Sequence, residues 1–486
     1  MFNPLTNETT EYNIPTPNST ATNIAADSQG DIWFSELTSN KLGEWRDGSI
    51  VEYPIPGGTV LVAGQSEEQA CGPTQVVPDK LGHIWVICIF SNQIDEFFPG
   101  NDTFYSFDLP IFQSGPAGLV FDNSGNFWFT AADSNMIGRG IISELENGTS
   151  DGITEFAPLN QTYTFTFQKT MNLEGQTKSE KSSLPTPSGI ALSPDGNTLW
   201  ISEHVDSSFD SYNIKTGSLD RYWTSNTENQ YGYPISFPNG IAIDSSGTVW
   251  IAEHYGNKVA EFDPSTDSLT EYAVPCCGSS IAGVYTLTLG KNGTIWFVEI
   301  QGNAIGELAP IFGRQQGGGT VDLQLGESQI SMKATSSAIV PINVAYDAPG
   351  SNGTTVNLDI SGMSSTGALQ NLAASFNPSV FQISGSGNET GALDLSGSSL
   401  KPGVYDLTIS ARAYNDTVIY SRILKLVVVG SSSTTYNGLL IYGAVIGIVF
   451  SLIVIGALAL FQNKRRVRRA PSASSRRQRR SRIVRG

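Results

Sequence analysis

A glutamate recurs three residues after a tryptophan in four segments of the chain. The corresponding residue is a cysteine or an alanine in two further segments. Carboxylates that converge raise one another's pKa, and their oxygens suit hard cations such as Mg²⁺ or Ca²⁺. Two interpretations stay open: the glutamates form an arc that holds a divalent cation, or each accepts hydrogen bonds within its own sheet. In chain order the position reads Glu36, Cys88, Ala131, Glu203, Glu253 and Glu299.

Two histidines each follow one of these glutamates directly, in Glu203-His204 and Glu253-His254. They occupy equivalent positions of successive segments, so we expect them to face the same side of the molecule. Such a pair could carry protons or bind a metal, which makes both glutamates and both histidines candidate catalytic residues. The alternative is that the histidines are polar strand residues, hydrogen-bonded at a sheet edge. Adjacent strand residues point to opposite faces, so a glutamate and its own histidine are not expected to share one site.

The tryptophans belong to an internal repeat that predicts an all-β fold, a β-propeller. Successive tryptophans lie 43 to 72 residues apart, and most spacings are close to the roughly 40–50 residues of a four-stranded blade. Alternating apolar and polar residues, punctuated by Gly, Ser and Asn, indicate antiparallel strands within each repeat. An asparagine seven residues after most of the tryptophans suits a turn between two strands. The repeat tryptophans are Trp33, Trp85, Trp128, Trp200, Trp250 and Trp296.

We predict six blades, with seven as the alternative. The longest gap between tryptophans has room for extra chain at residues 161–183, which lack the repeat and are interpreted as an inserted loop or hairpin. The sixth repeat has no fourth strand. The chain begins with Thr9-Thr-Glu-Tyr-Asn-Ile-Pro15, which matches the fourth-strand pattern of Leu269-Thr-Glu-Tyr-Ala-Val-Pro275. We therefore expect the N-terminal strand to complete the last blade and to remove two open sheet edges.

The tryptophan repeat, the element Asn303-Ala-Ile-Gly306 and the Thr-Glu-Tyr-x-x-Pro strand together resemble the streptogramin lyase (virginiamycin B lyase) propellers. The resemblance covers about residues 1–312. It implies an enzyme that opens a cyclic depsipeptide lactone by elimination, using histidine, acidic partners and a magnesium ion. The family's histidines follow the first-strand proline, in a Pro-His-x-Ile pattern that faces the channel. The matching positions here hold no histidine and are Thr22, Thr74, Ala117, Ser188, Asn239 and Tyr285.

A weaker likeness links Pro238-Asn239-Gly240 to the metal-binding turn of gluconolactonase-like propellers. An acidic ligand on a neighbouring first strand would complete such a site, but the flanking repeats offer Ser188 and Tyr285. A base that removes a carbon-bound proton needs a pKa near the working pH. None of the channel-facing side chains of the first strands meets this requirement.

The C-terminal part of the chain predicts a second domain and a membrane anchor. A Gly-rich linker, residues 313–320, precedes short alternating strands over 321–430, which indicate an immunoglobulin-like β-sandwich. After a stalk of residues 431–437, residues 438–461 are uncharged and long enough to cross a hydrocarbon core of about 30 Å. The basic tail, residues 462–486, places the C-terminus in the cytoplasm by the positive-inside rule.

Charge is divided unevenly along the chain. Of 28 basic residues, eleven lie between Lys464 and Gly486, so the rest carries 17 basic and 45 acidic residues. An acidic body repels phosphate and argues against nucleic-acid binding, whereas the tail could contact anionic lipids. Sequons upstream of the apolar segment, such as Asn147 and Asn415, are consistent with a glycoprotein outside the cell. Export of the body requires a signal, which we expect to precede Met1.

The four cysteines suggest a disulfide at one end of the propeller. The alternatives are a vicinal Cys276–Cys277 bridge and a bridge from Cys71 to either of them. Cys88 replaces a repeat glutamate inside a strand and is predicted to be a buried thiol. The spacing of the cysteines does not suit zinc.

Two functions follow as hypotheses. In the first, a membrane-anchored, cell-surface propeller binds a small molecule, peptide, glycan or envelope component at its channel mouth. In the second, the protein is a lyase or lactone-cleaving enzyme that uses the carboxylate arc and a divalent cation. A third reading is an envelope component whose blades pack against identical copies, and the sequence leaves the oligomeric state open. The mouth would be lined by Thr22, Thr74, Ser188, Asn239 and Tyr285.

Overall fold

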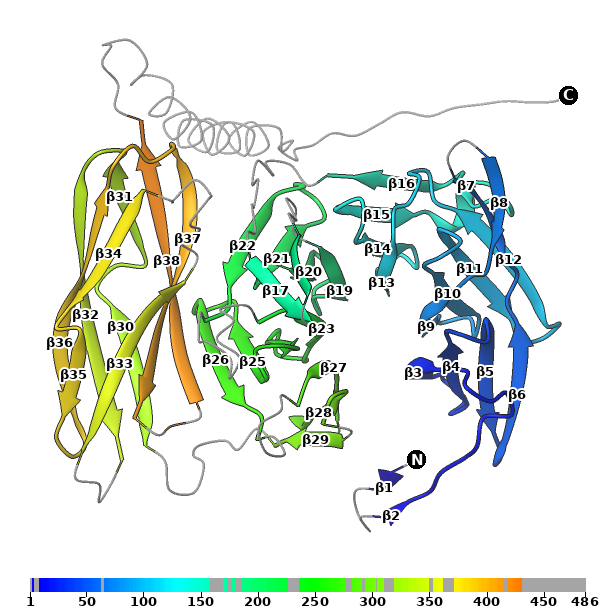
Figure 1. The fold of residues 1–486 in the computed structure, drawn as a ribbon, viewed down its shortest axis with the longest axis horizontal. Coiled ribbons are helices and arrows are strands. Elements are labelled where there is room, and N and C mark those ends of the chain that lie inside the picture. Colours follow the sequence, from blue (N-terminus) through cyan, green and yellow to red (C-terminus); the bar gives the residue numbers. More distant parts are fainter. Residues whose placement is uncertain are drawn as a thin grey trace, which may run out of the picture. The chain divides into compact units, whose positions relative to one another are not determined.

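In the computed structural model, the described residues form β-strands and one short 3-10 helix, η1 (Ile142–Glu144) (Figure 1). Residues 1–430 form one compact unit. No helix within the described residues is long and apolar enough to span a membrane. The predicted anchor, the stalk, the tail, most of the linker and Cys276-Cys277 lie outside the described residues. The structure describes residues 2–3, 8–62, 65–157, 169–173, 176–180, 186–205, 207–225, 236–275, 282–290, 293–302, 304–309, 319–348, 353–361, 371–414, 416 and 418–430.

Six antiparallel sheets each carry one copy of the tryptophan repeat, and we number them repeat sheets 1 to 6. The first three are β3 (Ala21–Ala26), β4 (Ile32–Glu36), β5 (Lys41–Arg46) and β6 (Ser49–Pro54); β9 (Pro73–Pro78), β10 (Ile84–Cys88), β11 (Gln93–Phe98) and β12 (Thr103–Asp108); and β13 (Pro116–Phe121), β14 (Phe127–Ala131), β15 (Met136–Gly140) and β16 (Ile153–Phe156). The last three are β19 (Pro187–Leu192), β20 (Thr198–Glu203), β21 (Ser208–Asn213) and β22 (Leu219–Trp223); β23 (Pro238–Ile243), β24 (Val249–Glu253), β25 (Lys258–Asp263) and β26 (Ser268–Ala273); and β27 (Val284–Leu289), β28 (Ile295–Glu299) and β29 (Ala304–Leu308).

The repeat sequence encodes a tight turn that anchors its tryptophan. The Asp27 carboxylate accepts the backbone N–H groups of Gln29 and Asp31 and the indole N–H of Trp33, at 2.8, 3.0 and 3.0 Å. Gly30 has φ +92°, a left-handed conformation that favours glycine. The same Asp-to-Trp hydrogen bond recurs in repeat sheets 2, 3 and 5. The repeat therefore fixes the first hairpin of a sheet and the position of its largest core residue.

The recurring asparagine joins one sheet to the next, as its turn preference predicted. Asn40 has φ +57°, and its side chain donates to the carbonyl of Ile55 and accepts the N–H of Gly72. Asn92 and Asn257 make the corresponding pairs of bonds in their own sheets. The structural interpretation of this position is confirmed.

The first strands lie side by side in chain order, so the sheets meet along their inner edges. Contacts run from β3 to β9, β13, β19, β23 and β27. The approach is close: a Cβ at Gly189 would lie 2.3 Å from the carbonyl oxygen of Asn239. Apolar cores fill the spaces between neighbouring sheets, as where Trp128, Ile190 and Leu199 pack together. This is the arrangement of a propeller-type fold, as predicted.

The N-terminal segment does not complete the sixth repeat sheet, which is a correction to the prediction. In the described part of the chain that sheet has three strands, β27-β28-β29. Residues 10–15 lie outside any strand, while β1 (Phe2–Asn3) pairs with β2 (Glu8–Thr9). Contacts with repeat sheet 1 hold the segment instead. Tyr12 packs edge-on against Trp45 at 5.3 Å, and the Thr16 N–H donates to Glu52 at 2.9 Å.

Two hairpins interrupt the repeat. One is β17 (Lys169–Leu173) with β18 (Gln176–Glu180), within the insertion predicted to be a loop or hairpin. The other, β7 (Gly58–Val62) with β8 (Gln65–Gln69), follows repeat sheet 1 and was not predicted.

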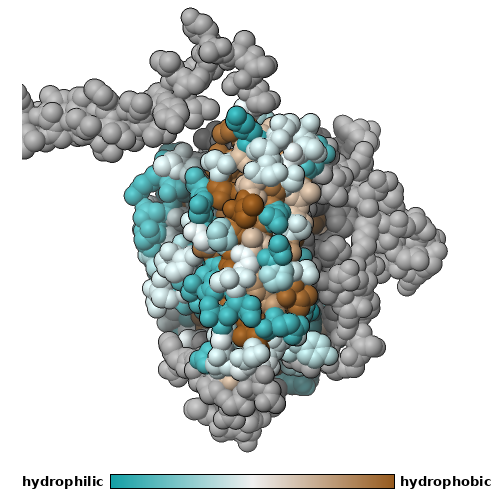
Figure 2. All heavy atoms as spheres, turned by 90° about the vertical axis from the view of Figure 1, so that its left-hand side faces the viewer, coloured by the Kyte–Doolittle hydropathy of each residue, from teal (hydrophilic) through white to brown (hydrophobic). Residues whose placement is uncertain are grey.

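Residues 319–430 form two sheets that share one apolar core. One sheet is β30 (Thr320–Leu325), β32 (Ser337–Asp347), β36 (Gly387–Gly397) and β34 (Leu372–Asn377). The other contains β38 (Val418–Val429), β37 (Gly403–Ala413), β33 (Thr354–Ser361) and β35 (Val380–Ile383), and β31 (Gln329–Lys333) pairs with β38 in parallel. Alternate residues such as Leu407 and Ile409 face the core. On the face of these sheets that Figure 2 shows, apolar residues lie among hydrophilic ones.

Strand β38 also joins the two parts of the chain. It pairs antiparallel with β26, from Ser268 opposite Arg422 to Tyr272 opposite Val418. Repeat sheet 5 therefore continues into residues 319–430 as one nine-stranded sheet. This pairing covers the outer edge of repeat sheet 5, which would otherwise present unpaired backbone groups.

Candidate ligand-binding site

The positions that match the family's histidines line the inner edges of the sheets. Their side chains bridge neighbouring first strands. Thr22 Oγ1 donates to the carbonyl of Pro73 at 3.2 Å, Ser188 Oγ donates to Asn239 Oδ1 at 2.5 Å, and Asn239 Nδ2 donates to the carbonyl of Tyr285 at 3.0 Å. The structure thus brings Ser188, Asn239 and Tyr285 together, while Thr22 joins β3 to β9 at a separate place along the inner edges. Thr74 and Ala117 occupy the equivalent places in β9 and β13.

The four repeat glutamates do not come together as one arc in the described part of the chain, and Glu36, Glu203 and Glu253 have partners within their own sheets. Glu253 is fully buried, and Lys258 Nζ lies 3.1 Å from it and 2.6 Å from Glu271. Burial raises the pKa of Glu253, and the neighbouring Glu271 carboxylate adds to that rise. The buried Lys258 ammonium therefore lies between two carboxyl groups, and the raised pKa of Glu253 favours a proton on one of them, so that the cluster stays near neutral.

Glu203 and Glu36 have other partners within their own sheets. The guanidinium of Arg221 lies 3.5 Å from Glu203 and 2.6 Å from Asp210. Glu36 accepts the hydroxyl of Ser39 at 2.8 Å, and burial raises its pKa. Burial likewise raises the pKa of Glu299.

A divalent cation does not fit these four carboxylates. Among the described residues, no three of them approach one another within metal-ligand distance. Two of them, Glu203 and Glu253, already face a cation of the protein. The structure thus favours the interpretation in which each repeat glutamate serves its own sheet.

A disulfide joins Cys71 to Cys88, so two predictions about cysteine are wrong. Cys88 is not a free thiol, and Cys71 is not available to Cys276 or Cys277. The reason is the connection between sheets: Cys88 lies opposite Pro73 in the β9–β10 pairing, which places it beside Cys71. Both cysteines are fully buried. The disulfide occupies the place of the ion cluster in repeat sheet 2.

His204 and His254 lie together, as their equivalent positions predicted. Their rings stack at 5.9 Å with an interplanar angle of 25°. His204 Nδ1 lies 3.2 Å from the carbonyl of Pro238, and His254 Nε2 lies 3.1 Å from the side-chain amide of Gln301. The ring of Tyr285, one of the predicted channel residues, meets His254 edge-on at 5.2 Å. We call His204, His254, Phe237, Tyr255, Tyr285 and Gln301 the imidazole cluster.

Both imidazoles are neutral at neutral pH. Burial lowers the pKa of His204. Burial and the proximity of His204 lower the pKa of His254 to about 4. A neutral imidazole offers one donor and one acceptor. Within the described part of the chain, no hydrogen-bond partner reaches the buried Nδ1 of His254.

Phe237 holds the cluster in place at a cost in backbone strain. Its φ is +50°, whereas the equivalent positions before three other first strands are the glycines Gly72, Gly115 and Gly283. A bulky residue in this region costs about 1–3 kcal/mol and persists only where its surroundings fix it. The Phe237 ring packs 5.2 Å from His204 and 4.9 Å from Tyr255. Phe237 was not among the site residues predicted from the sequence, although the glycines at the equivalent positions of other repeats mark it as unusual.

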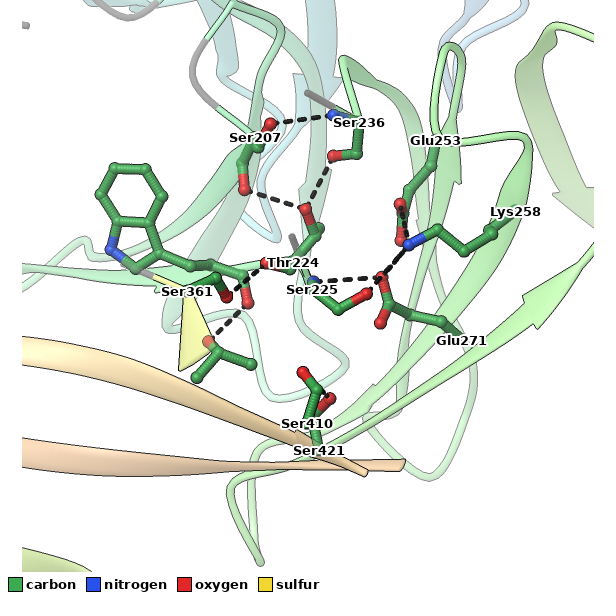
Figure 3. A network of polar contacts seen from close by, with 12 residues as sticks. Ser207, Thr224, Ser225, Ser236, Glu253, Lys258, Glu271, Ser361, Ser410 and Ser421 are labelled. Atoms are coloured by element: carbon green, nitrogen blue, oxygen red, sulfur yellow. Dashed lines mark hydrogen bonds and ion pairs between the residues drawn. The ribbon is translucent and has the colours of Figure 1, made fainter. Parts of the chain in front are cut away.

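A network of polar contacts begins at Ser236, the residue before Phe237 of the imidazole cluster (Figure 3). Ser236, which precedes Phe237, donates its N–H to Ser207 Oγ at 2.8 Å, and its hydroxyl lies 2.7 Å from Thr224 Oγ1. Ser225, which follows Thr224 in the chain, donates its N–H to the Glu271 carboxylate, and its hydroxyl accepts a hydrogen bond from Lys258 Nζ. The buried ion cluster and the backing of the imidazole cluster therefore form one connected unit.

The same network reaches residues 319–430. The Ser361 hydroxyl on β33 donates to the carbonyl of Thr224 at 2.8 Å, and the Thr408 hydroxyl on β37 donates to the carbonyl of Trp223 at 2.7 Å. Trp223 and Thr224, at the end of β22, are thus held by hydrogen bonds from both β37 and β33.

His83 belongs to a separate cluster in repeat sheet 2. Its Nδ1 lies 2.7 Å from Glu96 and 3.5 Å from Asp79, so the three residues have metal-ligand geometry. Asp79 also accepts the indole N–H of Trp85, as its counterparts do in other sheets. Asp79, His83 and Glu96 could hold a divalent cation, but they are not part of the imidazole cluster.

Comparisons with known proteins agree with the fold. Residues 112–284 match the model of the SMP-30/Gluconolactonase/LRE-like region. No curated protein sequence matches the chain. Similar solved structures include a catalytically inactive virginiamycin B lyase from Staphylococcus aureus with quinupristin, which is 21% identical with a TM-score of 0.49 and covers 62% of this chain and 85% of its own.

Two more solved structures are similar to the chain. A streptogramin B lyase is 23% identical with a TM-score of 0.46, over 61% of this chain and 85% of its own. A gluconolactonase from Xanthomonas campestris is 17% identical with a TM-score of 0.34, over 59% of this chain and 84% of its own. Residues 112–284 are thus similar to the SMP-30/Gluconolactonase/LRE-like region.

Proposed function

We propose that this protein binds a ligand at the imidazole cluster and is a binding protein of the cell surface. The observation that carries the proposal is the stacked pair His204 and His254, kept neutral by burial and flanked by the strained Phe237. Neutral imidazoles and aromatic rings suit an uncharged, partly apolar ligand, such as a sugar ring or a cyclic peptide. Strained residues of this kind gather at binding and catalytic sites.

The proposed architecture has six blades, an immunoglobulin-like sandwich and one transmembrane helix. Six repeat sheets support the blade count, and two sheets around one core support a sandwich over residues 321–430. The domains are the propeller at 1–312, the linker at 313–320, the stalk at 431–437, the helix at 438–461 and the tail at 462–486. In this proposal the propeller lies outside the cell and the C-terminus in the cytoplasm.

Binding is favoured over the family's lyase reaction because the first strands have no histidine where the family has its catalytic histidines. The positions that match the family's histidines hold Thr22, Thr74, Ala117, Ser188, Asn239 and Tyr285, and several of these side chains serve as bridges between strands. A base for proton abstraction must be free and have a suitable pKa. Glu36, Glu203 and Glu253 are buried and engaged with partners of their own sheet.

The test is a binding panel measured by calorimetry on the full chain in a detergent or nanodisc. The probes are muropeptides, chito-oligosaccharides and quinupristin. We expect one class to bind, and His254→Gln to weaken that binding by at least about tenfold, since a lost polar contact of this kind is worth about 1–3 kcal/mol. His83→Gln, in a different sheet, is the matched control and should bind normally. Binding that survives both His204→Gln and His254→Gln would contradict the proposal.

The second candidate function is a lyase or lactone hydrolase. Its support is the neutral imidazole pair, which can accept a proton, together with the family match over residues 112–284. Chromatography of quinupristin and of simple lactones after incubation, with and without Mg²⁺, separates this function from binding. Ring opening that His254→Gln abolishes would establish the enzyme. Intact probes in the presence of a measured binding heat would leave the binding function.

A further inference from the structure

A cavity of about 760 Å³ opens between repeat sheets 2 and 3, away from the imidazole cluster of sheets 4 and 5. Its walls come from the turn after β10, the connection between β12 and β13, and the turn after β14. The volume lies within the range of small-molecule sites. Two phenylalanines, Phe90 and Phe112, line it and are 55% and 50% exposed. Exposed aromatic rings beside a cavity mark a surface that gains from being covered.

Two left-handed glycines make the walls possible. Gly72 has φ +62°, and a Cβ there would lie 2.2 Å from the Phe90 ring. Gly115 has φ +65°, and a Cβ there would lie 2.6 Å from the Asp133 carboxylate. Glycine therefore lets Phe90 and Asp133 lie directly against the backbone. At the equivalent position in repeat sheet 5, Phe237 fills this space with its own ring.

The charge of the cavity is negative. Asp133 is the charged residue among the lining side chains, which include no lysine or arginine. The part of the chain before Lys464 carries 17 basic and 45 acidic residues, so the field around the cavity favours cations. Aromatic faces attract ammonium groups, and a carboxylate supplies the charge-assisted partner.

We propose that this cavity binds an organic cation, in which an alkylammonium group lies near Asp133 and an apolar part covers Phe90 and Phe112. The amide of Gln113, which has φ +52°, adds a polar wall. The ammonium can belong to a free small molecule or to a lysine side chain of a peptide, and the chemistry of recognition is the same. The proposal concerns a second site and does not depend on the function proposed for the imidazole cluster.

The experiment is a calorimetric titration of the full chain with benzyltrimethylammonium and with its neutral isostere neopentylbenzene. We expect the cation to bind at least about tenfold more tightly than the isostere. High salt should weaken the cation's binding, because the attraction is partly electrostatic. A titration with N-acetyl-lysyl-phenylalanine amide distinguishes the two sources of the ammonium, and tighter binding of either probe supports the site. Equal binding of cation and isostere, or no binding of either cation, would overturn it.

Variants locate the site. Asp133→Asn should weaken cation binding about tenfold, and Phe112→Ala should weaken it by a similar factor. Asp151→Asn is the control, since Asp151 is an exposed carboxylate of the same repeat region that does not line the cavity. Circular dichroism checks that each variant is folded, and His254→Gln should bind the cation normally. Cation binding that Asp133→Asn leaves unchanged would contradict the proposal.

Discussion

The imidazole pair shows how burial sets the chemistry of single residues in this molecule. His204 and His254 follow glutamates whose side chains point to the opposite side of the chain, and among the described residues no carboxylate forms a hydrogen bond or ion pair with either ring. Their neighbours include a backbone carbonyl, a side-chain amide and aromatic rings. Burial in such surroundings favours the uncharged form of each ring. The pair is therefore suited to recognise an uncharged ligand at neutral pH.

The histidine pair should make stability depend on pH. The pKa of both histidines is lower in the folded protein than the ordinary value of 6.5, and that of His254 is about 4. The unfolded chain then binds more protons between about pH 6.5 and pH 4, so the free energy of unfolding falls as the pH falls through this range. Urea denaturation at several pH values measures the fall. The His204→Gln/His254→Gln double variant should lose stability less steeply, and equal slopes would contradict the account.

The strain at Phe237 can be measured with two variants. Phe237→Ala keeps the left-handed backbone strain and loses the ring, whereas Phe237→Gly loses the ring but relieves the strain. We expect the glycine variant to be more stable than the alanine variant by about 1 kcal/mol. Phe209→Gly compared with Phe209→Ala is the control, since Phe209 lies within β21 outside the left-handed region, and there alanine should be the more stable. Equal stability of the two Phe237 variants would show that the position is not strained.

At the scale of elements, the repeat sheets differ in what fills the buried position three residues after the repeat tryptophan. Sheets 4 and 5 place a carboxylate there beside a cation, sheet 1 has Glu36 hydrogen-bonded to Ser39, sheet 2 has a disulfide, and sheet 6 has the buried Glu299. Sheet 3 has Ala131 at the position and buries the side chain of Glu155 from its fourth strand against Ser114. In each case the end of the second strand is buried, and a charged or polar group placed there is costly unless it is paired or hydrogen-bonded.

Removal of the cation from one such cluster should be costly. Lys258→Met leaves the buried carboxylates of Glu253 and Glu271 without their counterion. We expect a loss of about 3–5 kcal/mol in the free energy of unfolding. Lys215→Met is the control, because Lys215 is exposed in a turn and should change stability by less than about 0.5 kcal/mol. A loss at Lys258 no larger than at Lys215 would show that the cluster does not stabilise the sheet.

The repeat made the elements predictable, because the Asp-x-x-Gly-x-x-Trp turn and the left-handed asparagine depend on local contacts. The disulfide was not predictable in this way, since the sequence gives no sign that the connection before β9 places Cys71 against Cys88. Residues 9–15 do match the sequence pattern of a fourth strand, but the contacts of their side chains decide which sheet the segment packs against. Tyr12 and Thr16 make their contacts with Trp45 and Glu52 of repeat sheet 1. Long-range contacts of this kind have no short-range signature.

At the scale of the whole molecule, the two parts of the described unit share backbone hydrogen bonds. The β26–β38 pairing and the bonds from Ser361 and Thr408 link the sandwich-like sheets to repeat sheets 4 and 5. Neither strand carries a mark of this pairing in its sequence, since both read as ordinary alternating strands. The two parts should therefore unfold together rather than as independent domains.

Calorimetry tests this coupling. The wild-type unit should unfold in one transition. Ile419→Pro removes a backbone donor where β38 lies opposite Glu271 of β26, and it should separate the transitions of the two parts. Val429→Pro, at the end of β38 that pairs with β31, is the control and should keep a single transition at a lower temperature. Two transitions in the wild-type protein would contradict the coupling.

The most direct test of the binding account observes the three histidines themselves. Nuclear magnetic resonance of the full chain, labelled with ¹⁵N in its imidazoles, follows His83, His204 and His254 during titration with muropeptides, chito-oligosaccharides and quinupristin. The account predicts that the signals of His204 and His254 move together with one of these probes, while His83 stays unchanged and the probe remains intact. Movement of His83 alone, no movement with any probe, or conversion of the probe would contradict it.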